Sequence, residues 1–398
     1  MYATRLLSMC RKFPSLLAEP AVEAPNSGYL VITDEETELE DTCCFGMCDD
    51  PKVRELPFPV NKIVNVEYRT GTGNHRRVER DKVWFIPVLD QPLSSNQYYV
   101  IRAKGKYKGQ TCTCSKEEDA VTVCFCNCGS DVKPRALNYR DIYQQVEVFK
   151  KPKGILSDSG FSAKSVAPDG SPPRFLRRKG WTVHYSSSYQ YYVSEAHGLN
   201  FTLRPSLPDF HFQISEKRSS SVIVGNWYCP FVFIKEQERP KDQMKNSLLY
   251  TMTLEKFWEE IFTCENVDIS ENNVLDVDAS VQREVASIYG MEAIRDDRSS
   301  IDGTVWYTNI GSDETVASVG LSAAIVEKMR WIQEMGGWIA GEETVRVQRR
   351  EVFEGREYRW KRFGCFVLVE RFALRRMDRT LILTCDYRYM DHIQTKWE

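Results

Sequence analysis

The chain has 398 residues, of which 42% are hydrophobic and 27% are charged. This length is enough for two domains that each bury a core, and the composition excludes a largely disordered chain. The 53 Lys and Arg residues face 56 Asp and Glu residues, and the net charge of -3 gives no overall basic surface for phosphate binding. Nucleic acid is therefore not an expected partner.

Residues 1–27 are predicted to be an N-terminal segment ahead of the folded part. The start, MYATRLLSMCRKFPSLL, has no apolar stretch of the kind that a secretory signal needs, and no later run approaches the roughly 18 residues of a membrane-spanning helix. We therefore expect a cytoplasmic protein with reduced thiols. Arg5, Arg11 and Lys12 with no acidic residue before Glu19 leave organelle targeting as the alternative, beside a simply frayed end.

Residues 28–150 are predicted to be a cysteine-rich β domain. Short runs of β-branched and aromatic residues alternate with turn residues, as in YLVI, IVNVEY, VWFIPV and YYVIR. Two stretches return in the same order: NSGYLVI at 26–32 as SNQYYVI at 95–101, and CFGMCDDPKVREL at 44–56 as CFCNCGSDVKPRAL at 124–137. This pattern favours an internal duplication.

Residues 151–180 show the clearest change of composition. The stretch KPKGILSDSGFSAKSVAPDGSPPRFLRRKG is rich in Pro, Gly, Ser and basic residues and has no lasting periodicity, so we predict a linker. Within it, RFLRRKG is the strongest basic run of the sequence. A solvated linker is its plainest interpretation, and contact with anionic lipid or with the acidic residues of a partner is the alternative.

Residues 181–398 are predicted to be a second, β-rich α+β domain. A helix is expected over 253–266, where Leu, Phe, Trp and Ile recur at helical spacing after Thr253. A second helix is expected over 321–335, ended by two glycines. Residues 360–388 alternate between two faces and predict a long antiparallel hairpin that turns at 375–379.

The cysteines offer a candidate metal site. Both copies of the predicted duplication contain C-F-x-x-C, so Cys44, Cys48, Cys124 and Cys128 could converge as four thiolate ligands of a structural zinc ion. The spacing fits less well than C-x-x-C, and no histidine lies in either cluster. Reduced cysteines that fill strands are the plainer interpretation, and S-acylation at Cys43 and Cys44 is a further alternative.

The stretch CTCSKEEDAVTVCFCNC at 112–128 predicts a hairpin that turns through Lys116–Asp119. A four-residue loop pairs Cys114 with Val121 and separates the cysteines onto two faces, whereas an odd-length loop gathers them on one. The sequence leaves this parity open.

Signatures of catalysis are weak. GTGNHR at 71–76 lacks the third glycine of a dinucleotide fingerprint and indicates a turn, and neither a phosphate-binding loop nor a nucleophile elbow is present. Asp276 and Asp278 could hold a divalent cation, and His184 lies near three serines, but solvated acidic residues and a polar turn explain both patterns. No catalytic residue and no cofactor beyond the zinc are predicted.

Several motifs together resemble a family of land-plant proteins known as domain of unknown function 1262. They are MYATRLLSM, PNSGYLVI, TCCFGMC, FIPVLDQPLSSNQYYVIR, SKEED followed by CFCNC, AKSVAPDGSPPRFLRRKGW, GNWYCPF and the ending QTKWE. The resemblance extends over nearly the whole chain. It implies a plant protein of uncharacterised activity with an association to stress or defence, and it supplies no catalytic residues.

The overall prediction is a β-rich α+β protein of two domains built from antiparallel sheets and hairpins with a few packed helices. Because no residues converge on chemistry, we expect a non-enzymatic interaction protein with a protein partner. The alternatives are a structural zinc-binding module and a membrane-acting defence protein that inserts an amphipathic hairpin, with 360–388 and 281–309 as the candidate segments.

The zinc site can be tested directly. If the four cysteines bind zinc, protein purified without a chelating tag contains about one zinc per chain, and a chelator lowers the melting temperature of the N-terminal half, because metal affinity contributes to folding. Metal analysis and thermal unfolding with and without chelator check this. Cysteines that only fill strands give no zinc and no response to chelator.

Overall fold

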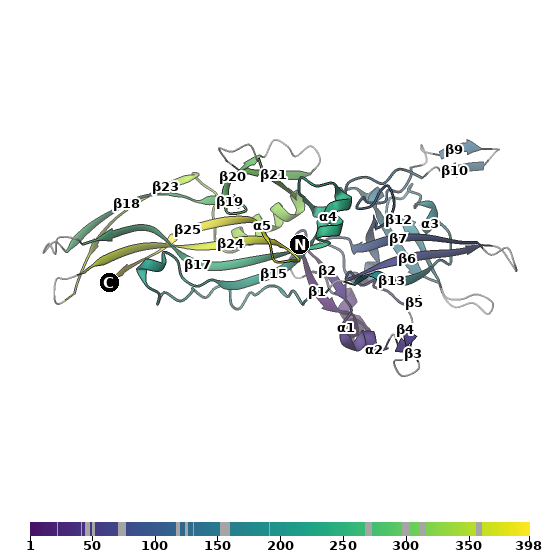
Figure 1. Ribbon diagram of the computed structural model, residues 1–398, viewed down its shortest axis with the longest axis horizontal. Coiled ribbons are helices and arrows are strands. Elements are labelled where there is room, and N and C mark those ends of the chain that lie inside the picture. The colour runs from purple at the N-terminus through teal and green to yellow at the C-terminus, as the bar shows by residue number, and fades with distance from the viewer. Residues whose placement is uncertain are drawn as a thin grey trace.

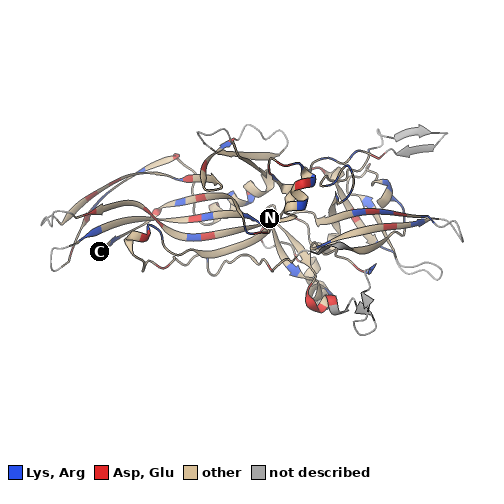
Figure 2. Ribbon diagram, viewed as in Figure 1, with Lys and Arg blue, Asp and Glu red and all other residues tan. Residues whose placement is uncertain are grey.

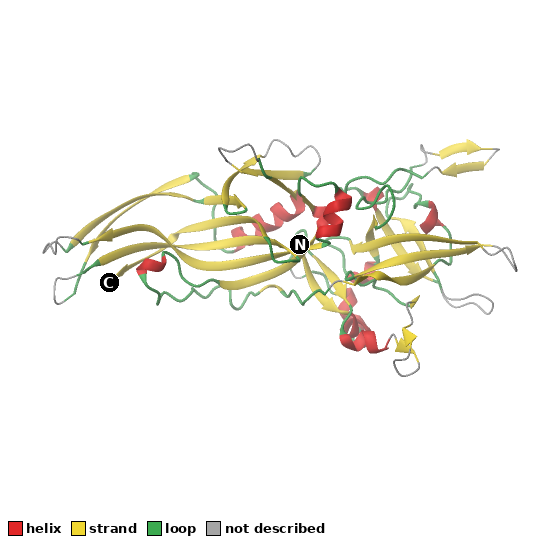
Figure 3. Ribbon diagram, viewed as in Figure 1, coloured by secondary structure: helices red, strands yellow, loops and turns green. Residues whose placement is uncertain are grey.

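The computed structural model describes the chain except for 22, 41, 44–47, 50–51, 71–76, 117–119, 124–125, 130, 152–159, 191, 267–272, 297–302, 310–315 and 356–359. Side chains are also not described at 39–40, 42–43, 48–49, 120–123, 126–129 and 187–190. Figure 1 shows an elongated molecule with a smaller sheet at one end and long strands that run to the other. Strands dominate over helices in Figure 3, so the β-rich prediction is confirmed.

The first sheet has seven strands. In spatial order they are β12 (Phe161–Ser165), β11 (Gln145–Lys150), β8 (Gln97–Arg102), β7 (Arg77–Pro87), β6 (Lys62–Thr70), β13 (Thr182–Gln190) and β5 (Lys52–Val53). All these neighbours are antiparallel. Valine, phenylalanine and tyrosine side chains from alternate positions form a buried core on one face of the sheet.

The segment 151–180, which we predicted to be a linker, contributes a strand and buried side chains to the first sheet. Strand β12 pairs with β11 along five residues, and Leu176 and Trp181 lie fully buried in the core of the first sheet. Proline and glycine in this segment make turns between short elements, so their composition misled the prediction. The first sheet therefore extends as far as β13.

The second sheet has twelve strands and contains both ends of the chain. Its order is β16 (Ile234–Lys235), β22 (Ser318–Ser322), β21 (Thr304–Asn309), β20 (Met291–Asp296), β19 (Glu284–Ile288), β25 (Leu381–Trp397), β24 (Arg362–Arg376), β17 (Leu249–Glu265), β15 (Val222–Pro230), β1 (Tyr2–Leu6) and β2 (Gly28–Ile32). Strand β14 (Gly198–Leu199) pairs with β15. Only the pair of β1 and β2 is parallel among the described ladders of this sheet.

Three further two-strand pairs and ten short helices complete the described elements. The strand pairs are β3 (Thr42–Cys43) with β4 (Cys48–Asp49), β9 (Ala120–Val123) with β10 (Cys126–Gly129), and β18 (Val274–Gln282) with β23 (Thr344–Val352). The α-helices are α1 (Leu7–Lys12), α2 (Glu35–Glu40), α3 (Arg174–Arg177), α4 (Pro240–Asn246) and α5 (Ala323–Met335). The 3-10 helices are η1 (Pro14–Ala18), η3 (Leu93–Ser95), η5 (Ile142–Gln144), η6 (Ile214–Glu216) and η7 (Phe231–Phe233).

The helix predicted over 253–266 is wrong, because these residues belong to strand β17. Leu254 and Trp258 point into the main core, whereas Phe257 packs in a separate cluster on the opposite face of the sheet. A strand buried on both faces carries apolar residues at odd and even positions, and such a run matches helical spacing equally well.

The other two predicted elements are confirmed. Helix α5 buries Ile325, Met329 and Ile332 against the second sheet and ends before Gly337, which has a φ of 87°. Strands β24 and β25 form the predicted hairpin, and their pairing runs from Arg375 with Leu381 to Phe363 with Trp397.

The prediction of two domains is not confirmed, because the two sheets share one core. Trp84 of β7 stacks on Phe231 at 6.0 Å between ring centroids, and Tyr99 of β8 meets Phe233 edge to face at 6.1 Å. The largest buried cluster contains residues of both sheets. The first residues are also part of this body, since β1 lies between β15 and β2 and is not a frayed end.

The hairpin predicted around 112–128 pairs differently from either expected register. Strand β9 pairs with β10, with Val123 opposite Cys126. Cys112 instead donates its amide to Val100, and Cys114 donates to Tyr143, so both lie buried beside the first sheet. Cys112 and Cys114 therefore belong to the first sheet's core and not to the β9–β10 pair.

A buried ion pair, together with a hydrogen bond from α5, fixes this helix to the long strands. Arg204 donates two hydrogen bonds to Glu370 of β24, at 3.1 and 2.7 Å, and Gln333 and Tyr389 each donate to the same carboxylate at 3.1 Å. All four side chains are more than nine-tenths buried. The carboxylate is thus fully hydrogen-bonded in a site from which water is excluded.

Removing one partner of this pair strongly destabilises the fold. We expect Arg204→Met to lower the free energy of unfolding by about 3–5 kcal/mol, because an uncompensated carboxylate stays buried. Urea unfolding measures this, and Arg350→Met, which removes an exposed ion pair with Asp276, is the matched control with little effect. Equal effects of the two substitutions would contradict the structural role of Glu370.

Candidate functional site

The structure does not describe the side chains of the four predicted zinc ligands. Cys44 and Cys124 lie outside the described residues, and the side chains of Cys48 and Cys128 are not described either, although their backbones belong to the separate strand pairs β3–β4 and β9–β10. Among the described residues, no group of three or more His, Cys, Asp or Glu side chains could hold a metal ion. The zinc site therefore stays a prediction.

The other sequence candidates are placed by the structure in ordinary contacts. His184 on β13 lies 3.3 Å from the hydroxyl of Thr182, and GTGNHR at 71–76 is outside the described residues. Asp276 and Asp278 each pair with an arginine of the neighbouring strand, Arg350 and Arg346. These hydrogen bonds hold the pKa of both carboxyls below the usual value, so they act as ion pairs on an exposed face.

The most unusual feature of the described structure is the two-stranded sheet of β18 and β23, which we call the ribbon. Its nine residue pairs run from Val274 opposite Val352 to Gln282 opposite Thr344. Figure 1 shows the ribbon lying alongside the far ends of β17, β24 and β25. Within the described residues, no backbone-to-backbone hydrogen bond joins 274–282 or 344–352 to the twelve-stranded sheet, and the first such bond comes just beyond the ribbon, from the amide of Arg388 to the carbonyl of Arg283.

The ribbon is amphipathic because its side chains alternate. On one face lie Leu275, Val277, Ala279 and Val281 of β18 together with Val345 and Val347 of β23. The other face carries mainly charged and polar side chains: Asp276, Asp278, Ser280, Gln282, Arg346, Gln348 and Arg350. Arg349 and Glu351 interrupt the apolar face of β23 and pair with each other at 3.1 Å.

The apolar face covers an aromatic cluster at the tip of the molecule. Val277 is 2% exposed and belongs to one cluster with Phe363, Cys365 and Trp360. Trp397 lies at the centre, with ring centroids 4.5 Å from Phe363 and 5.0 Å from Trp360. The indole N–H of Trp360 is buried and has no hydrogen-bond partner within the described structure. One polar group of this cluster is therefore buried without the hydrogen bond that normally offsets its desolvation.

The ribbon pairs the same two segments of the chain as β17 and β24. The last pair of β17 and β24 is Glu265 with Arg362, and the first pair of the ribbon is Val274 with Val352. Backbone hydrogen bonds extend both ladders by one residue, from the amide of Asn266 to Lys361 and from the amide of Phe353 to Asn273. The two strands are therefore still opposite each other where they leave the sheet and where they enter the ribbon.

The ribbon does not fit closely along its whole length. A cleft of about 660 Å³ lies between its end at Ser280–Gln282 and residues Glu259–Ile261 of β17. Arg388 bridges one side of the cleft, with a hydrogen bond of 3.0 Å to the carbonyl of Gln282. Contact between the ribbon and the sheet is therefore concentrated at the aromatic cluster.

Ion pairs occupy the same face of the sheet further from the tip. Arg371 pairs with Asp386 at 2.6 Å, and Arg388 of β25 pairs with Glu259 of β17 at 2.7 Å. Figure 2 shows blue basic and red acidic segments close to one another on the long strands. These ion pairs lie beside a small apolar cluster of Phe257, Val367 and Val369, and the aromatic cluster under the ribbon is nearer the tip.

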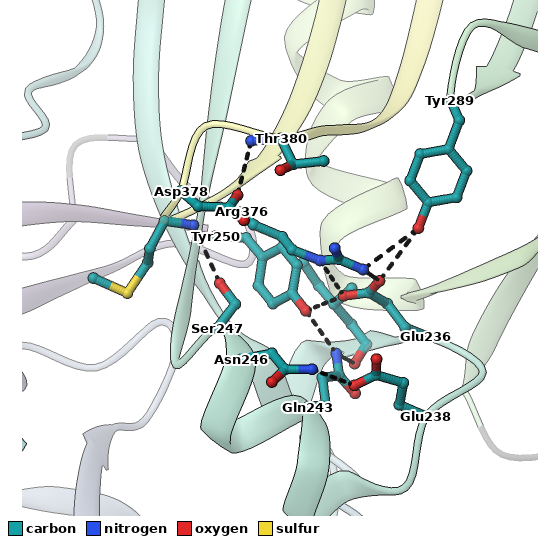
Figure 4. Close-up of polar contacts among 12 residues, drawn as sticks. Glu236, Glu238, Gln243, Asn246, Ser247, Tyr250, Tyr289, Arg376, Asp378 and Thr380 are labelled. Carbon is teal, nitrogen blue, oxygen red and sulfur yellow. Dashed lines mark hydrogen bonds and ion pairs between the residues drawn. The ribbon is translucent and has the colours of Figure 1, made fainter.

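The opposite end of the long strands is fixed by a dense polar network (Figure 4). Glu236 accepts hydrogen bonds from Arg376 at the end of β24 and from the hydroxyl of Tyr250 on β17. Gln243 of α4 donates to the same hydroxyl at 3.1 Å, and the amide of Met377 donates to Ser247 at 3.2 Å. The hydrogen bonds and charge of Glu236 raise the pKa of Arg376, so this anchor stays charged.

The two segments proposed for membrane insertion from the sequence alone belong mainly to strands of the second sheet. Residues 360–388 form central strands that are buried on both faces, and 281–309 contribute β19, β20 and β21 to the second sheet. The ribbon was missed because its strands are 61 residues apart in the chain. The signal that could have found it is the alternation VLDVDASVQ, matched by TVRVQRREV.

Residues 23–125 match a family model described as "Protein of unknown function (DUF1262)", which assigns a domain of unknown function to 103 of the 398 residues. This agrees with the resemblance in the sequence, and the plant origin stays a prediction. No curated protein matches the sequence. The crystal structure of Cry35Ab1 is similar with a TM-score of 0.44 and 10% identity, over 85% of this chain and 90% of that chain.

The ribbon is expected to open before the rest of the sheet. Because it lacks backbone hydrogen bonds to the sheet, its amides have a lower free energy of opening than those of the long strands. In native-state hydrogen exchange, peptides of 274–282 and 344–352 should exchange well before peptides of 249–265 and 362–376. Equal protection of the two sets would show that the ribbon and the sheet open as one unit.

Proposed function

We propose that the protein acts on membranes by lifting the ribbon from the tip of the long strands. The observation that carries this proposal is the ribbon itself: nine residue pairs with one apolar face, stacked on an aromatic cluster without backbone hydrogen bonds to it. Lifting it presents two apolar surfaces at one end of an elongated molecule. No described helix is long and apolar enough to cross a membrane.

Water opposes this motion and a bilayer favours it. Burial of a Val or Leu side chain stabilises by about 1.5–3 kcal/mol, so exposing the inner face of the ribbon costs about 5–10 kcal/mol in water. At a bilayer the same side chains are buried again, so most of that cost disappears. The closed state is therefore stable in solution, and contact with lipid shifts the population towards the open state.

The tip carries the residues that a membrane interface favours. Tryptophan is enriched at the boundary between lipid and water because its ring is apolar and its N–H needs a polar partner. Trp360 and Trp397 lie under the ribbon, and the unpartnered N–H of Trp360 gains a partner among lipid headgroups or water when the ribbon lifts. Nine residue pairs also approach the 9–11 residues with which a strand crosses the apolar part of a bilayer.

The architecture lets the ribbon move as a unit. Its two strands stay paired with each other, and the network around Glu236 and Arg376 holds the long strands at the far end. At its inner end the ribbon continues into β19, which pairs with β25 as part of the second sheet. The ribbon therefore swings about this end.

An association with plant defence follows only from the family resemblance, and it is consistent with a membrane-acting protein. The protein partner expected from the sequence stays a prediction beside this proposal. The cytoplasm as the compartment of action is part of the same expectation.

Release of a dye from vesicles tests the proposal. We expect micromolar protein to release a trapped fluorophore from vesicles that contain anionic lipid. Absence of release over a range of pH and lipid composition would refute membrane action.

Two neighbouring positions of β23 test the role of the ribbon. Val347→Lys places a charge on the apolar face, where a lysine in the middle of a bilayer costs about 2–4 kcal/mol, so release should fall at least tenfold. Gln348→Lys adds the same charge on the opposite face and should leave release within about twofold. Val345→Thr, which is nearly isosteric at a half-buried position, should give an intermediate loss, and thermal unfolding verifies that each variant is folded. Equal release by all variants would exclude a role of the ribbon in membrane action.

A further inference from the structure

A second cleft, of about 730 Å³, lies in the first sheet, and neither the ribbon nor the long strands contribute to it. It is formed by the start of β7, the end of β8, residues 131–134 and the first turn of α3. In Figure 1 these elements lie at the end of the molecule opposite to the ribbon. Its volume is within the range of about 300–1,000 Å³ that small-molecule sites occupy.

The cleft has an excess of positive charge. Its cations are Arg77, Arg80, Arg102, Lys133 and Arg174, and its acidic residues are Glu79, Asp81 and Asp131. All three acidic side chains already have partners: Asp81 pairs with Arg102 at 2.7 Å, Glu79 pairs with Arg178 at 2.9 Å, and Asp131 accepts the backbone amide of Arg174 at 2.9 Å. With five cations and three carboxylates in the lining, a net charge of +2 remains.

Two of the cations have no partner in the described part of the chain. Arg77 and Lys133 are exposed at the cleft, and neither side chain makes an ion pair or a hydrogen bond there. Unpaired arginine and lysine side chains around a concavity attract an anion, and arginine matches the geometry of phosphate oxygens. The basic run RFLRRKG contributes Arg174 to the same wall.

A buried hydroxyl without a partner lies in the lining. Thr113 is 4% exposed and lines the cleft, and its Oγ1 makes no hydrogen bond within the described structure. A buried polar atom of this kind is rare in a native protein, because its desolvation is not compensated. The hydroxyl has no surface open to the cleft, so the Thr113 side chain must rotate for a ligand oxygen to become its partner.

The lining favours recognition over covalent chemistry. Burial raises the pKa of the Cys112 thiol to about 12, so this side chain stays protonated and is a poor nucleophile. The ring of Phe175 lies under the guanidinium of Arg102, at 5.0 Å, and gives the cleft an apolar wall. The arrangement suits a compact anionic ligand that forms no covalent bond to the protein.

We propose that this cleft binds a phosphate-bearing ligand, with Arg77 and Lys133 contacting the phosphate oxygens and Thr113 donating a hydrogen bond. The ligand is a phosphorylated polyol, either free in solution or as the headgroup of a lipid. The inference stands on the first sheet alone and does not depend on the ribbon.

Binding is measured with two probes that distinguish the sources. Inositol hexakisphosphate in calorimetry represents the free ligand, and intact vesicles that contain phosphatidylinositol 4-phosphate in sedimentation represent the lipid. We expect the protein to bind at least one probe. Binding of only the soluble probe assigns the cleft to a free ligand, and binding of only the vesicles assigns it to a lipid.

Substitutions in the cleft decide whether binding occurs there. Arg77→Gln combined with Lys133→Gln should weaken binding at least tenfold, and Thr113→Val, which is nearly isosteric and removes only the unpartnered hydroxyl, should weaken it several-fold without loss of thermal stability. Arg330→Gln combined with Lys241→Gln removes the same charge from exposed positions outside the cleft and should have little effect. Failure to bind either probe, or binding that these cleft substitutions leave unchanged, would overturn the inference.

Because neither readout requires vesicle leakage, the two proposals fail separately. Vesicle binding without release would refute membrane action by the ribbon and leave the cleft in place. Release by the unaltered protein, with neither probe bound, would do the reverse.

Discussion

The long strands β17 and β24 are hydrogen-bonded on both sides along much of their length, β25 has a second neighbour from Leu383 to Tyr387, and this constraint organises the molecule. A strand in such a position can be stable only if both of its faces are covered or charge-paired. On one face, α5 closes over the strands and hydrogen-bonds the buried carboxylate of Glu370 through Gln333. On the other face, the side chains in the middle of the molecule form ion pairs, and the ribbon covers the tip.

The two kinds of cover differ in how easily they are removed. Helix α5 contributes to the core that both sheets share, so its removal would unfold the protein. The ribbon contributes a few aliphatic side chains and no ladder hydrogen bonds, so its removal exposes only the tip. A protein with one firm and one weak cover can change shape locally and keep its overall fold.

Local pattern was enough to predict elements whose pairing is also local. The alternation after Arg379 predicted the β24–β25 hairpin, and the apolar stripe with its terminal glycines predicted α5. Strand β17 was mistaken for a helix because a strand buried on both faces loses its alternation. The shared core was not foreseen because Trp84 and Phe231, which stack on each other, are far apart in the chain.

The two candidate sites were beyond sequence reasoning for the same reason. The ribbon joins segments on either side of a 61-residue excursion, and the cleft collects Arg77, Thr113, Lys133 and Arg174 from four separate stretches. In each case the sequence contains the right residue types, as Asp276 with Asp278 and the run RFLRRKG show. Their roles depend on neighbours that only the fold supplies.

The register of the ribbon also limits how this chain can vary. Side chains of a strand alternate with a period of two, so one residue added within β18 or β23 would turn the apolar side chains beyond it outward and the charged ones against the tip. Insertions and deletions within these two strands are therefore compatible with an amphipathic ribbon only in pairs.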